Sequence, residues 1–408
     1  MTAPRGVAIL GSTGSVGRAA LEVVLAAPGQ LRVVALAARR NVERLAAQVE
    51  RARPQLVAVA DPEAAEALRR RLGGALSPRA SGAPETPGPA GGGPVVVGGP
   101  EGVVAAATHP EAEVVVVGIV GIAALRPTLA AAEGGKRIAL ASKEVLVAAG
   151  PLLLAAARRR GAVIVPADSE HNALFQCLAG EAPESVARVV LTASGGPFLR
   201  RPLETLETVT PEEVLAHPVW RMGPRITVDS ATMMNKGLEV IEASRLFGLP
   251  PERIEVLIHP QAVVHGLVEF VDGSVKAILA PPDMRIVLHH ALHHPQRRPA
   301  PFGRLDLTAL GPLTFERPDP DRYPALALAR QAARAGGTGP AVLNAADEVA
   351  VARFLAGAIP FGDIVRVVRR VVEAHTPVAE PDLEAILAAD RWARAEAARV
   401  SDTIRGRA

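Results

Sequence analysis

Short apolar runs alternate with amphipathic stretches over the first 150 residues. Parallel strands covered on both faces read as continuous apolar runs, whereas surface helices repeat apolar residues every three or four positions. Helical spacing occurs at Arg18–Ala27 and Val42–Ala52. The runs expected to be strands are Gly6–Leu10, Val33–Ala37, Leu56–Ala60, Val114–Val117 and Ile138–Ala141. This alternation predicts an α/β fold with a doubly wound parallel sheet.

One segment interrupts the pattern. Ser77–Gly102 is crowded with proline and glycine, and Val95–Val97 are nearly its only large apolar residues. A segment of this composition has too little apolar surface to form a core. We therefore expect a surface loop here.

The pattern becomes mixed beyond residue 150 and purely helical beyond Tyr323. Pro295–Pro320 is rich in proline and arginine, which indicates a linker. The expected strands are Val163–Val165, Val186–Thr192, Glu255–Ile258, Val263–Phe270 and Val275–Leu279. The expected C-terminal helices are Ala325–Arg334, Ala341–Leu355, Ile364–Ala374 and Leu383–Arg399. The predicted organisation is an α/β domain at 1–150, a central α+β domain at 151–294, a linker at 295–320 and a helical bundle at 321–408.

A glycine turn follows the first expected strand. It reads Gly11-Ser-Thr-Gly14-Ser-Val-Gly17 and leads directly into a helix. Glycines let the backbone turn sharply and approach a pyrophosphate, which the free N–H groups of the helix N-terminus then hold. A tight turn without a ligand is the alternative, but the strand–turn–helix context favours a Rossmann-like dinucleotide site.

The end of the second expected strand indicates which dinucleotide would bind. An NAD site usually places an acidic residue there to bind the ribose 2′-hydroxyl. Here the chain reads Arg39-Arg40-Asn41, and no acidic residue lies between Glu22 and Glu43. Two guanidinium groups suit a 2′-phosphate, so NADP is favoured over NAD. The alternative is a solvated pair of surface arginines.

Composition narrows the class of protein. A chain of 408 residues, 49% hydrophobic and 21% charged, suits a globular protein of two or three domains. The formal charge is only +3, basic residues are scattered, and aromatic residues make up 3%, which disfavours a nucleic-acid partner. The longest uncharged apolar run, Val114–Leu125, is too short to span a membrane. The single cysteine, Cys177, excludes an internal disulfide and fits a cytoplasmic location.

Lysine is scarce in this chain. Of 45 lysine and arginine residues, the only lysines are Lys136, Lys143, Lys236 and Lys276. Because lysine carries a compact ammonium and arginine a planar fork, a lysine retained here indicates a position that needs the ammonium. Chance is the alternative for any one of them.

Acidic residues point to a metal site in the central domain. Asp168 and Glu170 follow the apolar strand Ala162–Val165, and in extended chain their side chains would point the same way. Two such carboxylates can meet one hard cation. Glu239 is the candidate for a third carboxylate.

The segment from Asp229 to Glu239 is expected to begin with N-cap residues and to run into one amphipathic helix. Asn235 and Lys236 lie four and three residues before Glu239, so the three share one helix face. This face suits a phosphorylated sugar beside a metal. Ser194, in the Ser-Gly-Gly turn after Thr192, would add hydroxyl and backbone donors to the same phosphate.

Each of these features has a plainer interpretation: a solvated acidic pair, an ordinary turn or a surface salt bridge. Together they resemble the 1-deoxy-D-xylulose 5-phosphate reductoisomerase family, in order along the whole chain, and Asp229–Glu239 is the most specific part. The matching segments are Gly11–Gly17, Leu140-Ala-Ser-Lys-Glu144, Pro166-Ala-Asp-Ser-Glu-His-Asn172, Leu191-Thr-Ala-Ser-Gly-Gly-Pro-Phe198, His217-Pro-Val-Trp220, Ile226–Glu239 and Leu257-Ile-His-Pro-Gln261.

The resemblance implies an NADPH- and Mg²⁺- or Mn²⁺-dependent homodimer that converts 1-deoxy-D-xylulose 5-phosphate to 2-C-methyl-D-erythritol 4-phosphate, a step toward isoprenoids. The implied metal ligands are Asp168, Glu170 and Glu239. The implied substrate contacts are Lys143, Ser169, Glu170, Ser194, His217, Trp220, Ser230, Asn235, Lys236 and Glu239, of which Lys143, Glu170 and His217 are the catalytic residues. The implied cofactor contacts are Thr13, Gly14, Ser15, Val16, Arg39, Arg40, Asn41, Ser142, Glu144 and Gly223. The family also implies that His217 and Trp220 belong to a mobile flap over the substrate.

Three positions depart from the usual family pattern. Arg39 stands where glycine is common, Ser142 where asparagine is common, and Ala193 where glycine is common. These departures put the strength of NADPH binding in question and leave the implied metal ligands intact. The insertion around Ser81–Gly93 is also longer than the family needs.

Other functions fit the sequence less well. Cys177 lies in an apolar helical stretch and is expected in the core, which disfavours a thiol-dependent dehydrogenase. The only tyrosine, Tyr323, has no lysine four residues later, as a short-chain dehydrogenase requires. A non-enzymatic NADP sensor stays open, although it has no reason to gather three carboxylates.

A histidine cluster has two interpretations. His289-His290-Ala-Leu-His293-His294 has helical spacing that can bind zinc, but no partner carboxylate motif follows it. Structural or surface histidines are therefore favoured. His171 and His265 are expected to support the active site from behind it.

Overall fold

A computed structural model describes residues 3–73, 93–216 and 223–405 of the chain. The chain divides into two compact units whose segments are interleaved in sequence. The first unit comprises residues 1–142, 153–168 and 283–302. The second comprises residues 143–152, 169–282 and 303–408.

A seven-stranded parallel sheet forms the centre of the first unit, with strand order β4-β3-β2-β1-β5-β6-β7. The strands are β1 (Arg5–Leu10), β2 (Leu31–Ala38), β3 (Leu56–Val59), β4 (Val95–Gly98), β5 (Val114–Val117), β6 (Arg137–Leu140) and β7 (Val163–Pro166). The helices are α1 (Ser15–Leu25), α2 (Val42–Ala52), α3 (Pro62–Arg71), α4 (Pro100–Ala107), η1 (Ile122–Ala124), α5 (Leu125–Glu133) and α11 (Met284–His293).

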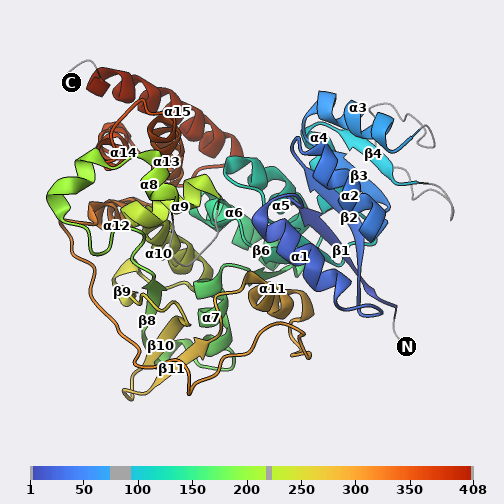
Figure 1. Cartoon of the computed structure of the whole chain (residues 1–408), viewed down its shortest axis with the longest axis horizontal. Coiled ribbons are helices and arrows are strands. Elements are labelled where there is room, and N and C mark those ends of the chain that lie inside the picture. Colours follow the sequence, from blue (N-terminus) through green and yellow to red (C-terminus); the bar gives the residue numbers. More distant parts are fainter. Residues whose placement is uncertain (1–2, 74–92, 217–222, 406–408) are drawn as a thin grey trace. The chain divides into compact units, whose positions relative to one another are not determined.

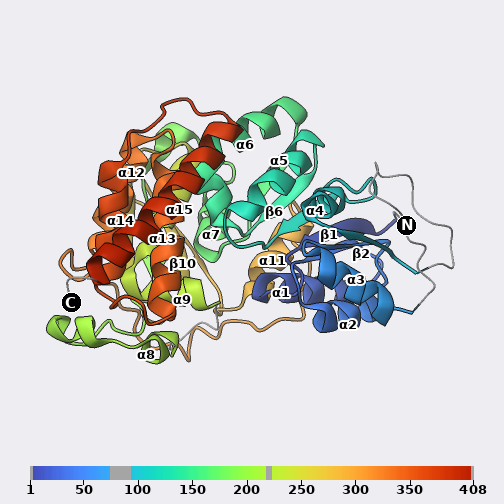
Figure 2. The same cartoon turned by 90° about the horizontal axis from the view of Figure 1, so that it is seen from above.

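Helices cover both faces of this sheet. Helices α2 and α3 pack on one face, and α4 contacts strands β1 to β4 from the other face beside α5 (Figures 1 and 2). All four valines of β5 are fully buried, as a central strand between two helical layers requires. The predicted doubly wound fold is therefore confirmed, and the five strands expected in the first 150 residues lie within two residues of their expected positions.

Two parts of the first unit differ from expectation. Val95–Gly98 is a strand at the sheet edge and Pro100 opens a helix, so the expected loop does not extend to Gly102. Four residues suffice for an edge strand here because β4 pairs in parallel with β3 and buries Val96. The rest of that expected loop, and most of the Ser81–Gly93 insertion, lie outside the described residues.

The domain ranges expected from sequence were continuous, whereas the two units are interleaved. β7 pairs with β6 and so extends the first sheet, although it lies beyond residue 150. Helix α11 packs on α1, and Arg5 Nη1 donates a hydrogen bond to Leu292 O at 2.9 Å. The crossing point lies in α6 (Lys143–Arg160), where Ala149 is non-helical and Pro151 interrupts the hydrogen bonds.

The second unit contains a mixed four-stranded sheet with strand order β11-β10-β8-β9. The strands are β8 (Val186–Ala193), β9 (Ile254–Ile258), β10 (Val264–Phe270) and β11 (Val275–Leu279). Helices α7 (Ser169–Leu178) and α10 (Met234–Phe247) pack against this sheet around Cys177, which is buried as expected. The remaining elements of this region are η2 (Pro183–Ser185), η3 (Leu203–Thr208), α8 (Pro211–Leu215), α9 (Pro224–Thr232) and η4 (Pro251–Arg253).

Four C-terminal helices complete the second unit (Figure 1). They are α12 (Pro324–Ala335), α13 (Gly339–Leu355), α14 (Asp363–Ala374) and α15 (Leu383–Arg405), close to the predicted ranges. Helix α13 is central, because it contacts α12, α14 and α15. α12 also packs on α10, so the bundle shares a hydrophobic core with the helices of the candidate site.

Residues 295–320 contain no helix or strand, and Glu316 forms an isolated β-bridge with Ile258. Over the described residues, none of the helices combines the length and the apolar character needed to cross a membrane.

Candidate active site

The glycine turn lies where the strand order reverses, because β1 has β2 on one side and β5 on the other. Gly11 has a φ of +80°, and a Cβ atom there would lie 2.4 Å from the carbonyl oxygen of Gly118. A side chain is therefore excluded on two grounds. Gly14 is the N-cap of α1 and has no side chain to cap it, which leaves the first N–H groups of the helix, from Ser15 and Val16, for a ligand.

The two candidate 2′-phosphate arginines are exposed just after β2. Arg40 Nε donates to Asp61 Oδ2 at 2.6 Å, and Asn41 caps α2 by accepting from Arg44 N at 3.0 Å. The pKa of Asp61 is lowered, first by the backbone N–H of Ala64 and then by Arg40. Asp61 follows β3 and is far from Arg40 in sequence, so the sequence pattern did not indicate that an acidic residue holds Arg40 in place.

Helix α2 also holds the glycine turn in place. Arg44 Nη1 donates to Thr13 O at 3.1 Å, and Gln48 Nε2 donates to Ser12 O at 2.8 Å. Ser142, at the end of β6, is buried and donates to Val117 O at 3.2 Å. Its hydroxyl also contacts Ile119 O, so Ser142 secures the segment that follows β5.

Three carboxylates converge in the second candidate site. Asp168 is the last residue of the first unit and is bonded directly to Ser169, the first residue of α7. One carboxylate oxygen from each of Asp168, Glu170 and Glu239 lies within 4.8 Å of the others. The expected reason for this was wrong, because Glu170 lies in the first turn of a helix rather than in extended chain. The tight turn into α7, not strand alternation, brings the two acids of this segment together.

Two lysines and an amide surround Glu239, which is only 1% exposed. Lys143 Nζ donates to Glu239 Oε1 and to Asn235 Oδ1, both at 2.8 Å. Lys236 Nζ donates to Glu170 Oε1 at 2.8 Å and also pairs with Glu239. Burial alone would lower the pKa of Lys236, but the charges of Glu170 and Glu239 raise it. Two of the chain's four lysines thus lie among these carboxylates.

The Asp229–Glu239 segment is not one helix. α9 ends at Thr232, Met233 takes a left-handed conformation with φ of +64°, and α10 begins at Met234. Asp229 is therefore no N-cap but a fully buried residue within α9. The break places Asn235 and Lys236 in the first turn of a new helix, where the helix dipole favours an anion. Asn235 Nδ2 still donates to Glu239 Oε1 at 2.6 Å, so the predicted shared face exists.

The Ser194-Gly195-Gly196 loop after β8 approaches α9 closely. Gly196 has a φ of +70°, and a Cβ atom there would lie 2.8 Å from Ser230 O. Gly196 N donates to Ser194 Oγ at 3.3 Å, which fixes the turn. The missing side chain thus allows the two segments that carry Ser194 and Ser230 to lie side by side.

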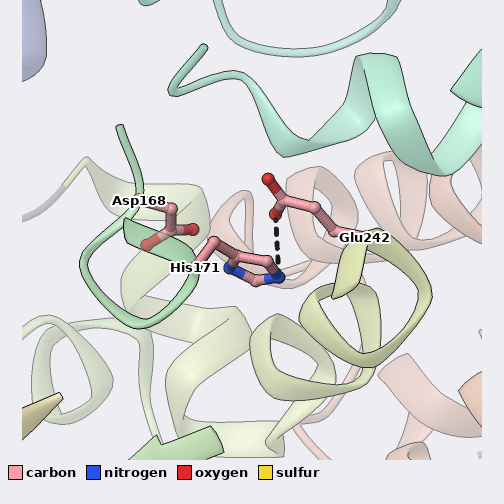
Figure 3. Close-up of side chains that lie close together, drawn as sticks. All are labelled: Asp168, His171 and Glu242. Atoms are coloured by element: carbon pink, nitrogen blue, oxygen red, sulfur yellow. Dashed lines mark ion pairs between the residues drawn. The ribbon is translucent and has the colours of Figure 1, made fainter. Parts of the chain in front are cut away.

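A second group of metal-binding side chains shares Asp168. His171 lies between Asp168 and Glu242, and its Nε2 is 3.7 Å from Glu242 Oε2 (Figure 3). His171 is fully buried, and its Nε2 is also 3.0 Å from the carbonyl oxygen of Glu239. The histidine thus links α7 to α10 behind the metal ligands, so we favour Asp168, Glu170 and Glu239, where Glu170 stays partly accessible. His265 is buried and 3.2 Å from Ala280 O.

Several predicted residues lie elsewhere. Glu144 pairs with Arg225 at 2.8 Å, and Gly223 is the N-cap of α9. Ser169 Oγ donates to Glu170 Oε2 at 2.6 Å. His217 and Trp220 lie outside the described residues. The histidines of α11 form no three-residue metal group within the described ranges, and burial lowers the pKa of His290 to about 4.

Sequence reasoning missed a buried charged cluster around Arg225. Its carboxylates come from α6, α9 and α13, and those of Asp229 and Asp347 are fully buried. Helical periodicity predicted α13 but not its polar face. The signal available was Asn344 with Asp347 and Glu348 at helical spacing inside an otherwise apolar stretch.

The donor set fits a hard divalent cation, because three carboxylates supply only oxygen ligands and two ammonium groups limit their mutual repulsion. A Rossmann sheet with its glycine turn, combined with this carboxylate site, defines a dinucleotide-dependent enzyme with a metal site.

Comparison with known proteins identifies the family. Family models of 1-deoxy-D-xylulose 5-phosphate reductoisomerase match residues 7–150, and those of its C-terminal domains match residues 164–247 and 279–396. The enzyme of this name from Symbiobacterium thermophilum is 55% identical over 97% of this chain and 98% of its own length. That from Thermomicrobium roseum is 53% identical over 96% of each chain. The chain belongs to the 1-deoxy-D-xylulose 5-phosphate reductoisomerase family.

Solved structures agree. The Zymomonas mobilis reductoisomerase in complex with NADPH is 42% identical with a TM-score of 0.87, over 98% of this chain and 99% of the other. A reductoisomerase in complex with NADPH, fosmidomycin and magnesium is 37% identical with a TM-score of 0.90, over the same shares.

Proposed function

We propose that this chain rearranges and reduces 1-deoxy-D-xylulose 5-phosphate to 2-C-methyl-D-erythritol 4-phosphate, using NADPH and Mg²⁺ or Mn²⁺, in the non-mevalonate route to isoprenoid precursors. The observation that carries this proposal is the grouping of Asp168, Glu170 and Glu239 beside Lys143 and Lys236 in a member of this family. Relatives with known structures bind NADPH and magnesium, which supports the same cofactors here.

Asp168 and residues of the second unit would take different roles. Asp168, Glu170 and Glu239 would hold the metal, which when bound polarises carbonyl and hydroxyl oxygens as a Lewis acid. Lys236 and Asn235, at the N-terminus of α10, would bind the substrate phosphate together with Ser194 and Ser230, with Ser169 beside them.

Proton movement would fall to Lys143 and Glu170. Lys143 is buried and already donates to Glu239 and Asn235, so its ammonium is oriented before substrate binds. Glu170, whose side chain is partly accessible, would take up or release a proton. His217 and Trp220 would cover the substrate and exclude water.

The first unit would bind NADPH, which supplies a hydride for the reduction. Its pyrophosphate would lie on the turn Thr13–Val16, and Arg39 and Arg40 would bind the 2′-phosphate, with Asn41 beside them. Ser142, Glu144 and Gly223 would meet the nicotinamide end.

A homodimer in the cytoplasm is also proposed. β11 is an edge strand with exposed apolar side chains, since Val275 is 54% and Leu279 is 39% exposed. An exposed apolar sheet edge favours pairing with a second copy. The single buried cysteine fits a reducing compartment.

The test is NADPH oxidation by the purified chain, with 1-deoxy-D-xylulose 5-phosphate and Mn²⁺ each omitted in turn. We expect loss of absorbance at the NADPH band only with both present, and methylerythritol phosphate as product by mass spectrometry. A chain that bound NADPH but turned over nothing would support the sensor alternative instead.

A further inference from the structure

Arg225, in the first turn of α9, lies at the centre of a buried charged cluster beside the candidate active site. Its side chain is 13% exposed. Its guanidinium reaches three helices, namely α6, α9 and α13. The contacts are Nη1 to Glu144 Oε1 at 2.8 Å, Nη1 to Glu348 Oε1 at 3.1 Å, Nη2 to Asn344 Oδ1 at 2.8 Å, Nη2 to Asp347 Oδ2 at 3.3 Å and Nε to Asp229 Oδ2 at 3.4 Å.

Only arginine can make this set of contacts. Its planar fork presents five N–H groups in fixed directions, whereas a lysine ammonium is a single point with three donors. Burial alone would lower the pKa of Arg225, but the surrounding carboxylates, Asp229 first, raise it. The guanidinium therefore stays charged and fixes the spacing of the three helices.

The cluster holds more acid than base. Four carboxylates face one guanidinium, and Arg394 of α15 adds a second cation only at the far oxygen of Glu348, at 2.7 Å. Burial raises the pKa of both Asp229 and Asp347. Among the described residues Asp229 accepts no hydrogen bond, although Arg225 Nε is its ion-pair partner at 3.4 Å. Asp347 is the neighbour that can share a proton with it. A proton shared by Asp229 and Asp347 would reduce the excess negative charge of this buried group.

Each anchor of Arg225 outside α13 adjoins a proposed site residue. Glu144 directly follows Lys143, whose Nζ contacts Glu239. Asp229 directly precedes Ser230, and Arg225 itself lies two residues after Gly223. α13 carries none of the proposed substrate or metal residues, yet it supplies three of the five contacts.

We propose that Arg225 is a positioning residue, through which helix α13 of the C-terminal bundle holds the Lys143 and Ser230 segments in register for the reaction. This inference rests on the proposed function, because Lys143 and Ser230 are substrate contacts only there. The C-terminal bundle, which supplies none of the proposed substrate or metal contacts, would thereby influence the rate of catalysis. Small displacements of reacting groups lower the reaction rate strongly. Substitution of Arg225 should therefore lower kcat more than it weakens cofactor binding.

The test compares Arg225→Lys with Arg394→Lys. Both substitutions keep the charge of a partly buried arginine in one network. Within the described parts of the chain, however, the ion-pair partners of Arg394 are Glu348 and Asp390, and neither belongs to α6 or α9. We expect Arg225→Lys to lower kcat about 10- to 100-fold. The Kd for NADPH, followed by fluorescence, and the Kd for Mn²⁺, followed by electron paramagnetic resonance, should change less than about threefold. Arg394→Lys should lose a similar amount of Tm while keeping wild-type kcat.

A second variant covers the case in which Arg225→Lys does not fold. Asn344→Ala removes the uncharged amide that contacts Arg225 and Glu348, and it places a good helix former in the helix interior, so the fold should persist. It should lower kcat several-fold at an unchanged Kd for Mn²⁺. If Asn344→Ala and a folded Arg225→Lys kept the kcat of Arg394→Lys, the positioning role would be overturned. Wild-type chain that failed to oxidise NADPH with the substrate would instead refute the proposed function, so the two failures are distinguishable.

Discussion

The two compact units build their candidate sites from different material. In the first unit the backbone makes the site, since a glycine turn and a helix N-terminus come from seven consecutive residues after β1. The metal site is instead made by charged side chains. Apart from Asp168, which ends the first unit, they come from helices of the second unit that are separated by about seventy positions of chain. A backbone site is local in sequence and tolerates many side-chain changes nearby. A charged site depends on the balance of positive and negative charges, because removing one charged side chain leaves its partners buried without a compensating charge.

This difference predicts where substitutions act most strongly. The largest effect should come from Glu239→Gln, which keeps the shape and removes one negative charge from three converging carboxylates. We expect kcat to fall about 100-fold or more and the Kd for Mn²⁺ to rise, because a ligand and the partner of two lysines are lost together. NADPH fluorescence without metal should report an unchanged Kd, since the glycine turn belongs to the other unit.

Glu239→Lys should be worse than Glu239→Gln, because it would place a third ammonium beside Lys143 and Lys236. Near-normal turnover by Glu239→Gln at limiting Mn²⁺ would show that the three carboxylates do not share a metal. The proposed contacts of Asn235 and Lys236 with substrate would then weaken too.

The dinucleotide site of the first unit also has a charged part, and substitutions there test the comparison of the two sites. Replacing Arg39 and Arg40 together with Ala should raise the KM for NADPH about 10- to 100-fold, as expected for lost charge-assisted hydrogen bonds to a phosphate. The KM for NADH should change much less. Equal losses for both cofactors would mean that these arginines do not bind the 2′-phosphate. Asp61→Asn is the matched control, because it releases Arg40 from its ion pair without removing either guanidinium.

A smaller effect should appear in stability as a function of pH. The pKa of Asp229 is raised well above its usual 3.8, chiefly by burial, so the folded chain holds a proton that the unfolded chain releases. The stability this proton gives is complete below about pH 4 and declines as pH rises toward the folded-state pKa. Asp229→Asn cannot ionise and should escape that decline.

Calorimetry at pH 5 and pH 9 would measure this effect. The Asp229→Asn variant should have a Tm higher than that of the wild type by about 2 °C or more at pH 9, with a smaller difference at pH 5. A Tm difference that stayed constant with pH would show that Asp229 does not retain a proton in the folded chain.

The same contrast explains what could be read from sequence. β5 is four consecutive valines between covered faces, so its pattern alone predicts its place. The break at Met233 could not be predicted, because no glycine or proline marks it and the buried Met233 itself takes the left-handed conformation. β7 reads as a strand in isolation, but its partner β6 is set by tertiary pairing.

The parts of the candidate site whose residues are close in sequence could be predicted, whereas contacts between residues that are far apart in sequence could not. The face shared by Asn235 and Glu239 follows from helical spacing and is present. Arg40 pairs with Asp61, 21 positions away, and Arg225 contacts Asp347, 122 positions away. A local sequence pattern cannot predict contacts over such separations. Burial of like charges on several helices is a property of the folded chain.

The smallest effect is expected from the glycine-rich insertion at Ser81–Gly93, most of which lies outside the described residues. Its composition offers almost no apolar surface to bury, and shortening a loop changes its closure entropy only slightly. Replacing the insertion with three or four glycine and serine residues should leave kcat, KM for NADPH and Tm nearly unchanged. As a control, a deletion that also removes Val95–Gly98 should destabilise the sheet, since β4 pairs along its whole length with β3. A large loss from the short deletion alone would mean that the insertion packs on the first unit or on a second copy of the chain. In that case only the glycine turn itself, and not the rest of the first unit, could be called more tolerant of substitution than the charged site.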